Sequence, residues 1–225
     1  FSLLMSKHTF WLAALAALAL GACQRPPLTS FRTLDTDFSK GRLSHQQEVD
    51  LRDLEKFHGH NCDGLAVGSV GLRQALNVLY PGGQPIDRTN LRIVSKPAPC
   101  LTDVAVYLTG ARYQFNTFYA DTAFAGLYIV QRLDNGQAVG VALNRGIKPP
   151  AIDSLSRLAV QGRLDGCELA ELKRQEDAFT QTILRGDPAR LFTVRPVPDF
   201  VWRPVLSGGF VKTDVLNKQV AACPK

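Results

Sequence analysis

The chain has 225 residues, of which 45% are hydrophobic and 20% are charged, and its formal net charge is +6. This length and apolar content suit one domain of ordinary size and argue against a second full domain. The basic residues are spread along the chain and form no cluster, which argues against a nucleic-acid-binding protein.

The first 22 residues carry the features of an export signal. Lys7 precedes an apolar stretch over residues 10–20, and small residues then lead directly to Cys23. This stretch is too short to span a bilayer as a permanent helix, so it predicts a cleaved signal peptide over residues 1–22.

Cys23 indicates the form of the mature protein. A cysteine directly after small residues resembles the bacterial lipoprotein box, in which that cysteine becomes the first mature residue and carries a lipid. The alternative is an ordinary signal peptide with an incidental cysteine. Gln24 stands where retention in the inner membrane favours Asp. We therefore expect an exported, periplasm-facing protein that is anchored by a lipid on Cys23, in the outer membrane rather than the inner one.

We predict that residues 23–42 comprise the lipidated cysteine and a flexible tether. Residues 24–40 are rich in Pro, Ser, Thr and Arg, and their apolar residues show no helical or strand periodicity. The folded domain is then expected over residues 43–225. Apolar residues at roughly helical spacing predict its first helix over residues 44–57, with Ser44 as the N-cap.

The densest group of reactive side chains comes directly after this predicted helix and comprises His58, His60 and Cys62. Imidazole nitrogen and thiolate sulfur are the ligands that zinc and the later transition metals prefer, and the same groups can supply a nucleophile with its base. After Gly64, helical spacing predicts a second helix that ends before Pro81, so Cys62 is expected at a helix N-terminus.

A second cysteine is expected at the start of another helix. Alternating apolar and polar residues predict a strand over residues 91–95, and helical spacing after two prolines predicts a helix from Cys100 to Gly110. Cys100 and Asp103 are three residues apart, so both can face the same way on its first turn. A helix N-terminus stabilises negative charge, which lowers a thiol pKa and favours metal binding or nucleophilic attack.

The remaining elements complete an α+β fold. Two strands over residues 124–133 and 137–144 are joined by an Asn-Gly turn, and two helices are predicted over residues 150–161 and 165–184. We expect a single domain in which a mixed or antiparallel sheet packs against helices.

Four cysteines remain when Cys23 carries a lipid, namely Cys62, Cys100, Cys167 and Cys223. In an oxidising compartment, an even number allows two disulfides. We predict a structural disulfide between Cys167 and Cys223, which leaves Cys62 and Cys100 free for chemistry. The alternative is a disulfide between Cys62 and Cys100.

The two cysteine-containing segments resemble the FmdE family of formylmethanofuran dehydrogenase subunits over residues 47–145. The resemblance rests on Phe57-His58-Gly59-His60, Cys62 and Gly64, and on Cys100, Asp103 and Thr109-Gly110. It implies an α+β core with a metal-binding pocket built from the histidine–cysteine motif and the later cysteine. By this resemblance His58, Cys62 and Cys100 lie in the pocket, and His60 and Asp103 lie beside it.

The chain also departs from the family pattern. Asp63 stands where the family usually has proline, and Ala111 stands where a further cysteine often occurs. The C-terminal part has only Cys167 and Cys223, too few for the four-ligand zinc module that some members add. Methanofuran chemistry is cytoplasmic, so we do not expect an exported lipoprotein to take part in it.

The residues and the resemblance leave three functional hypotheses. The first is a metal site in which His58, Cys62, Cys100 and the candidate ligand His60 hold a divalent transition metal, zinc first of all; His60 and Asp103 are the catalytic candidates. With three ligands and an open position, this site could activate water or accept a metal complex. The second is a metal-free thiol enzyme with Cys62 as nucleophile and a histidine base. The third is a redox or structural protein with a Cys62–Cys100 disulfide.

We expect the protein to bind a small molecule or a metal complex. Its expected protein partners are a second copy of this chain or envelope proteins that handle metals.

Overall fold

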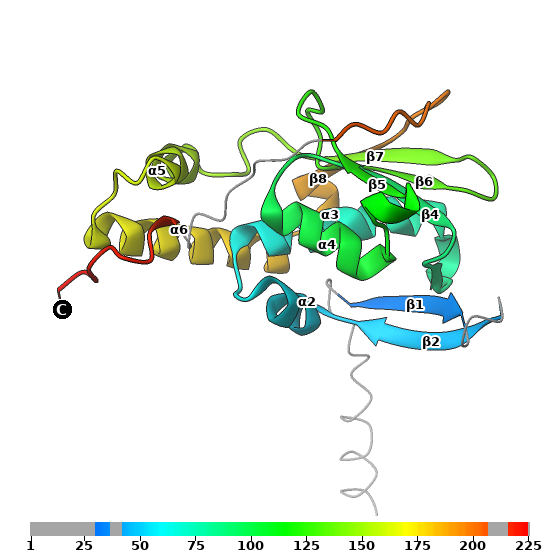
Figure 1. Cartoon of the computed structure of the whole chain (residues 1–225), viewed down its shortest axis with the longest axis horizontal. Helices are drawn as coiled ribbons and strands as arrows, with labels where there is room; N and C mark the ends of the chain where they lie inside the picture. Colours follow the sequence, from blue (N-terminus) through cyan, green and yellow to red (C-terminus); the bar gives the residue numbers. More distant parts are fainter. Residues whose placement is uncertain (1–29, 37–41, 207–215, 225) are drawn as a thin grey trace, which may run out of the picture.

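A five-stranded mixed sheet forms the centre of the structure, a computed structural model that describes residues 30–36, 42–206 and 216–224 (Figure 1). Its strand order is β5-β4-β6-β7-β8; β4 is parallel to β5, and the other neighbours are antiparallel. Helices pack on this sheet, so the predicted α+β class is confirmed. The strands are β4 (Leu91–Ser95), β5 (Phe118–Ala120), β6 (Tyr128–Arg132), β7 (Ala138–Leu143) and β8 (Phe192–Pro196).

Helix α3 (Asp63–Leu79) is the most deeply buried helix in the described part of the chain, because it packs against the sheet and against neighbouring helices. Gly68 permits its close approach to the sheet, since a Cβ atom at this position would lie 2.7 Å from the hydroxyl oxygen of Tyr128. That hydroxyl is itself fixed, because it donates a 3.0 Å hydrogen bond to the carbonyl oxygen of Leu101. Helix α3 is therefore held firmly against both β6 and helix α4 (Pro99–Thr109).

Strand β4, helix α4 and strand β5 form a parallel β-α-β unit. Helix α4 starts with Pro99 in its first turn, where the missing N–H loses no helical hydrogen bond, and Gly110 ends it in the left-handed conformation with φ of 70°. Since α4 comes after β4 along the chain, its N-terminus and Cys100 lie beyond the carboxyl end of that strand. The predicted strand and helix are both confirmed here.

The segment before the cysteine motif differs from the prediction. Residues 44–57 do not form one helix: β2 (Leu43–Val49) pairs antiparallel with β1 (Phe31–Thr36), and helix α2 (Leu51–His58) comes next. The break occurs because the side chain of Asp50 accepts hydrogen bonds from the backbone of Arg52 and Asp53, which makes Asp50 the N-cap instead of Ser44.

Strand β1 also corrects the predicted tether. The prediction of a flexible segment over residues 23–42 is wrong for Phe31–Thr36, which pair with β2 on one side and with β3 (Ile86–Asp87) on the other. Phe31 and Thr33 are buried, so this part of the chain belongs to the folded domain. The predicted signal peptide, Cys23 and residues 24–29 lie outside the described residues.

The C-terminal helices form an arm beside the sheet (Figure 1). Helix α5 (Pro150–Val160) packs on the long helix α6 (Gly166–Arg185), and α6 also contacts α3; the short helix α7 (Pro188–Leu191) leads into β8. These helices and the β6–β7 hairpin confirm the predictions for this part of the sequence. None of the helices in the described ranges is long and apolar enough to cross a membrane.

Candidate metal centre

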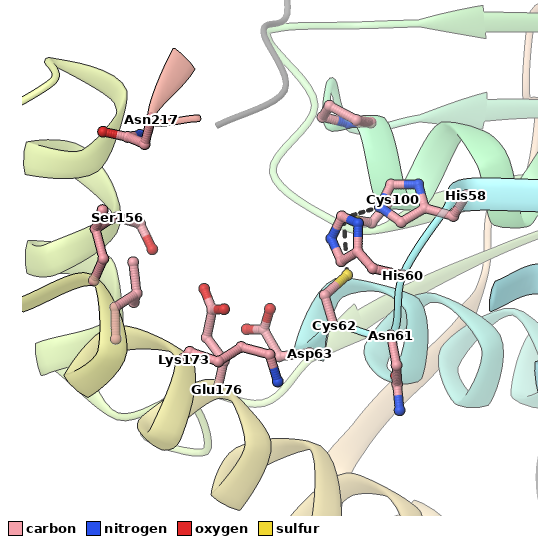
Figure 2. Close-up of a pocket in the computed structure, with 13 residues that line it drawn as sticks. His58, His60, Asn61, Cys62, Asp63, Cys100, Ser156, Lys173, Glu176 and Asn217 are labelled. Atoms are coloured by element: carbon pink, nitrogen blue, oxygen red, sulfur yellow. Dashed lines mark hydrogen bonds between the residues drawn. The ribbon is translucent and has the colours of Figure 1, made fainter. Parts of the chain in front are cut away.

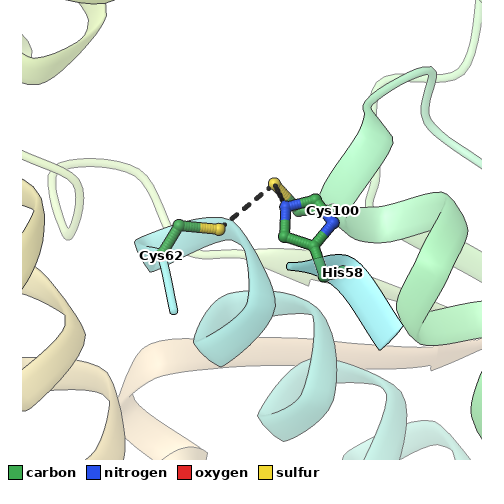
Figure 3. Close-up of side chains that lie close together, drawn as sticks. All are labelled: His58, Cys62 and Cys100. Carbon is green, nitrogen blue, oxygen red and sulfur yellow. Dashed lines mark hydrogen bonds between the residues drawn. The ribbon is translucent and has the colours of Figure 1, made fainter. Parts of the chain in front are cut away.

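Three side chains from three separate elements converge beside the N-terminus of α3 (Figure 3). His58 is the last residue of α2, Cys62 is the N-cap of α3, and Cys100 lies in the first turn of α4. One ligand atom from each lies within 4.8 Å of the others. The two sulfurs are 3.2 Å apart, and the sulfur of Cys100 is 3.6 Å from Nε2 of His58.

Local structure explains why His58 is placed there. Helix α2 is anchored by the completely buried Leu54 and starts with a capping box between Asp50 and Asp53. It ends at Gly59, whose φ of 105° is accessible to glycine at little cost. The left-handed turn at Gly59 redirects the chain, so that His58 is buried while His60 is exposed.

Asp103 fixes the orientation of the His58 ring. The distance from Nδ1 of His58 to Oδ2 of Asp103 is 2.7 Å, which leaves Nε2 directed toward the sulfurs. This hydrogen bond, and after it the interaction with Cys62, raises the pKa of His58 to about 9. A histidine that binds metal through one nitrogen usually donates its other N–H to such a carboxylate.

The two thiols have opposite acidities. A hydrogen bond from Cys100 is the main cause that lowers the pKa of Cys62 to about 4, and His58 lowers it further. The same hydrogen bond raises the pKa of Cys100 above its ordinary value. Cys62 is therefore the sulfur that ionises first, and Cys100 is the sulfur that retains its proton.

The donor set fits a transition metal ion. Thiolate sulfur and neutral imidazole nitrogen are preferred by zinc, and the carboxylate behind the imidazole is the outer partner that such sites use. Structural zinc sites have four protein ligands, whereas catalytic sites keep one position for water or substrate. Within the described residues this group supplies three ligands.

A cavity of about 490 Å³ opens beside these three side chains (Figure 2). His58, Cys62 and Cys100 lie on one side, and residues of α5, α6 and the C-terminal segment lie on the other. Its lining is formed by His58, His60, Asn61, Cys62, Asp63, Pro99, Cys100, Ser156, Leu169, Leu172, Lys173, Glu176 and Asn217.

Two carboxyl groups, those of Asp63 and Glu176, face this cavity. Burial is the main cause that raises the pKa of Asp63, and Lys148, whose Nζ lies 3.5 Å from its carboxylate, acts against that shift. Lys148 is shared, since it also lies 3.0 Å from Asp153. Burial raises the pKa of Glu176 to about 7, and the negative charges of Asp63 and Cys62 add to this effect.

The structure brings together most, but not all, of the residues that the sequence singled out. His58, Cys62 and Cys100 form one group, and Asp103 contacts it through His58. His60 lines the cavity with its ring centroid 4.7 Å from that of His58, but it is not part of the group. Cys62 and Cys100 are free thiols, whereas Cys167 and Cys223 form a disulfide.

Sequence reasoning missed the opposite wall of the cavity. The sequence does contain an indication for Glu176. This residue lies four positions after Leu172 and three before Phe179, so it falls on the apolar stripe of α6. A charged residue on a buried stripe is unusual and marks a position to inspect. Ser156, Lys173 and Asn217 carry no comparable signal.

Comparison with known proteins places these features in context. The family model "FmdE, Molybdenum formylmethanofuran dehydrogenase operon" matches residues 57–193. A crystal structure of a tungsten formylmethanofuran dehydrogenase FmdE-like protein from Syntrophus aciditrophicus aligns with a TM-score of 0.40 and 17% identity, over 66% of this chain and 72% of the other. No curated protein matches the chain.

Proposed function

The chain belongs to the FmdE family, and on that premise we propose that His58, Cys62 and Cys100 hold a divalent transition metal ion, with zinc as the first choice. The observation that carries this proposal is the convergence of three ligand atoms within 4.8 Å of one another. We further propose that the coordination position not taken by a protein ligand faces the cavity and receives water, a small molecule or a metal complex.

The bound ion would supply Lewis acidity to a molecule in the cavity. The residues of the chain supply the remainder of the site. Asp103 holds the proton on Nδ1 of His58 and so keeps Nε2 available as a ligand. The N-termini of α3 and α4 stabilise the thiolates of Cys62 and Cys100. This division of roles suits a metal-dependent enzyme or an accessory protein that handles a metal or cofactor.

We also propose that the protein works at the periplasmic side of the bacterial envelope, anchored by a lipid on Cys23 in the outer membrane. Support comes from the apolar stretch over residues 10–20 and the small residues before Cys23. In that compartment, envelope proteins that handle metals and a second copy of this chain are the partners that we propose. Membership of the FmdE family supports the proposed metal pocket but does not by itself assign a reaction.

A thiol enzyme without metal is the second candidate function. It is favoured by the contacts of Cys62, because the hydrogen bond from Cys100 and then the interaction with His58 lower the pKa of Cys62 to about 4, as in activated nucleophilic cysteines. It ranks lower because three ligand atoms from three elements converge here and a carboxylate orients the imidazole, which is the arrangement of a metal site.

Metal content of the full-length chain tests the proposal. The protein would be extracted in detergent, purified without chelator or histidine tag, and analysed by mass spectrometry for metals together with a free-thiol titration. About one zinc ion per chain is expected, with loss in Cys62→Ser, Cys100→Ser and His58→Ala. His45→Ala is the matched control, since His45 is exposed on β2. Two reactive thiols without metal would support the thiol enzyme instead.

A further inference from the structure

Glu176 is the one carboxyl group of α6 that lines the cavity. It lies on the stripe of α6 that carries Leu172 and Phe179, and its side chain is partly buried. Figure 2 shows its carboxylate directed into the cavity from α6, and that of Asp63 directed into it from the start of α3, which also carries Cys62. Asp63 has Lys148 as a salt-bridge partner, whereas the carboxylate of Glu176 makes neither a hydrogen bond nor a salt bridge within the described residues.

The charged groups around Glu176 leave it able to take up and release a proton. Asp63 and Cys62 on the α3 side raise its pKa, and Lys148 and Lys173 lower it. Both lysines are already engaged, Lys148 with Asp63 and Asp153 and Lys173 with Asp177. Burial is the largest effect and brings the pKa to about 7, which is the range in which a carboxyl group works as general acid and base.

We propose that Glu176 is the proton acceptor and donor of a hydrolytic reaction in this cavity, an inference that rests on the proposed metal site. The oxygen of a water molecule forms a bond to the carbonyl carbon of the substrate while Glu176 takes a proton from that water. The bond from this carbon to the leaving group then breaks, and Glu176 returns the proton to the leaving group. One water is consumed, and an acid and an alcohol or amine are formed, so no oxidant or reductant is required.

General chemistry supports this combination of groups. A histidine and two cysteines around zinc, with a glutamate that is not a ligand, are the working parts of the zinc deaminases, in which the glutamate transfers protons to and from an sp² carbon centre. The same four residue types surround this cavity, as His58, Cys62, Cys100 and Glu176. The correspondence concerns the chemistry of the groups and not the fold.

The walls of the cavity also select the class of substrate. The lining holds two carboxyl groups, Asp63 and Glu176, and one lysine, Lys173, so it disfavours an anionic phosphoryl or sulfuryl group relative to a neutral ester or amide. Pro99, Leu169 and Leu172 offer apolar surface for its side group. A volume of about 490 Å³ limits the substrate to a small molecule. The class that fits is therefore a small, uncharged acyl compound.

Glu176→Gln tests the role of this residue with little change in volume, and Glu171→Gln is its matched control on α6, outside the lining of the cavity. Full-length wild type and both variants would be loaded with Zn²⁺ alone, and their zinc content and circular dichroism compared. Two further measurements are the kcat for 4-nitrophenyl acetate and the affinity for acetohydroxamic acid by calorimetry. Acetohydroxamic acid must give up a proton when it binds zinc, so its affinity reports the proton acceptor without turnover.

The expected result is that Glu176→Gln keeps its zinc and its fold, loses about 100-fold or more in kcat, and binds acetohydroxamic acid about tenfold more weakly. Glu171→Gln should behave as wild type. Equal kcat and equal acetohydroxamic acid affinity in zinc-loaded wild type and Glu176→Gln would overturn the inference, and so would a zinc-loaded wild type that hydrolyses no ester. Wild type that binds no zinc would overturn the proposed metal site itself, which is a separate outcome.

Discussion

At the scale of single residues, Asp103 decides which nitrogen of His58 is offered to a metal. Its hydrogen bond to Nδ1 leaves Nε2 near the sulfur of Cys100. We expect Asp103→Ala to weaken zinc binding by about 10–100-fold, with a smaller loss in Asp103→Asn, which retains an acceptor oxygen. Titration against a competing chelator measures this change. Asp177→Ala removes an exposed carboxylate from α6 and should leave the affinity unchanged.

The same residues predict how zinc binding depends on pH. Zinc requires neutral His58 and two thiolates, but His58 has a pKa of about 9 and Cys100 keeps its proton, whereas Cys62 is ionised above about pH 4. Binding at pH 7 should therefore release about two protons, one from His58 and one from Cys100. Calorimetry in buffers of different ionisation enthalpy counts them. A release of one proton or none at pH 7 would contradict this assignment.

The stability of the metal-free fold should show the opposite trend. The pKa of His58 is raised from 6.5 to about 9, so its ion pair with Asp103 stabilises the fold fully below pH 6.5. That contribution is lost as the pH rises toward about 9. Over the same interval the affinity for zinc rises, because fewer protons compete for Nε2. Urea unfolding of chelator-treated protein at several pH values, with His58→Ala as reference, measures the difference.

The sequence could name the site but could not rank its two histidines. His58 and His60 are two residues apart in one motif, and only the left-handed turn at Gly59 determines which one is buried. The role of Asp103 was open for a similar reason, because a contact over 45 positions of sequence depends on the packing of α2 against α4. The residue types predict a metal-binding or thiol site, but only the tertiary structure shows which of the candidate residues form it.

At the scale of secondary-structure elements, Gly64 sets the distance between α3 and α4 at the site. A Cβ atom there would lie 2.7 Å from Cβ and 2.8 Å from the sulfur of Cys100. Gly64→Ala should therefore displace Cys100, weaken zinc binding and lower the free energy of unfolding by about 1–3 kcal/mol. Gly68→Ala is the matched variant, since its Cβ would meet Tyr128 one turn further along the same helix. It should lower stability by a similar amount with a smaller effect on zinc, as thermal unfolding and chelator competition would show.

Strands β1 and β2 show where prediction from sequence fails at this scale. Six of the seven residues of β2 are exposed, so the strand has no buried face and no alternation of apolar and polar residues to reveal it. Its structure comes from pairing with β1 and from the Asp50 cap that starts α2. Strand β4 and helix α3, by contrast, are deeply buried, and the spacing of their apolar residues predicts both correctly.

At the scale of the whole molecule, the disulfide between Cys167 and Cys223 ties the C-terminal segment to the start of α6. It connects residues 56 positions apart, so its removal should lower the free energy of unfolding by about 2–4 kcal/mol. The metal ligands come from α2, α3 and α4, which the disulfide does not join. We therefore expect the double variant Cys167→Ser/Cys223→Ser to unfold at lower temperature and still bind zinc. Zinc loss in the folded double variant would show that the C-terminal arm is needed to form the site.

The distribution of the three ligands along the chain has a consequence for the order of assembly. His58 and Cys62 are near neighbours in the sequence, but the position of Cys100 beside them depends on the pairing of β4 in the sheet and the packing of α4 on α3. The core that holds these elements together is apolar and extends far beyond the ligand Cys62, which lies at its edge. We therefore expect a chelator to remove zinc while the far-ultraviolet circular dichroism stays unchanged, unlike in small zinc fingers, which unfold without metal. The newly made chain would thus fold before it binds its metal ion. The supply of metal would then determine the activity of the protein and not the stability of its fold.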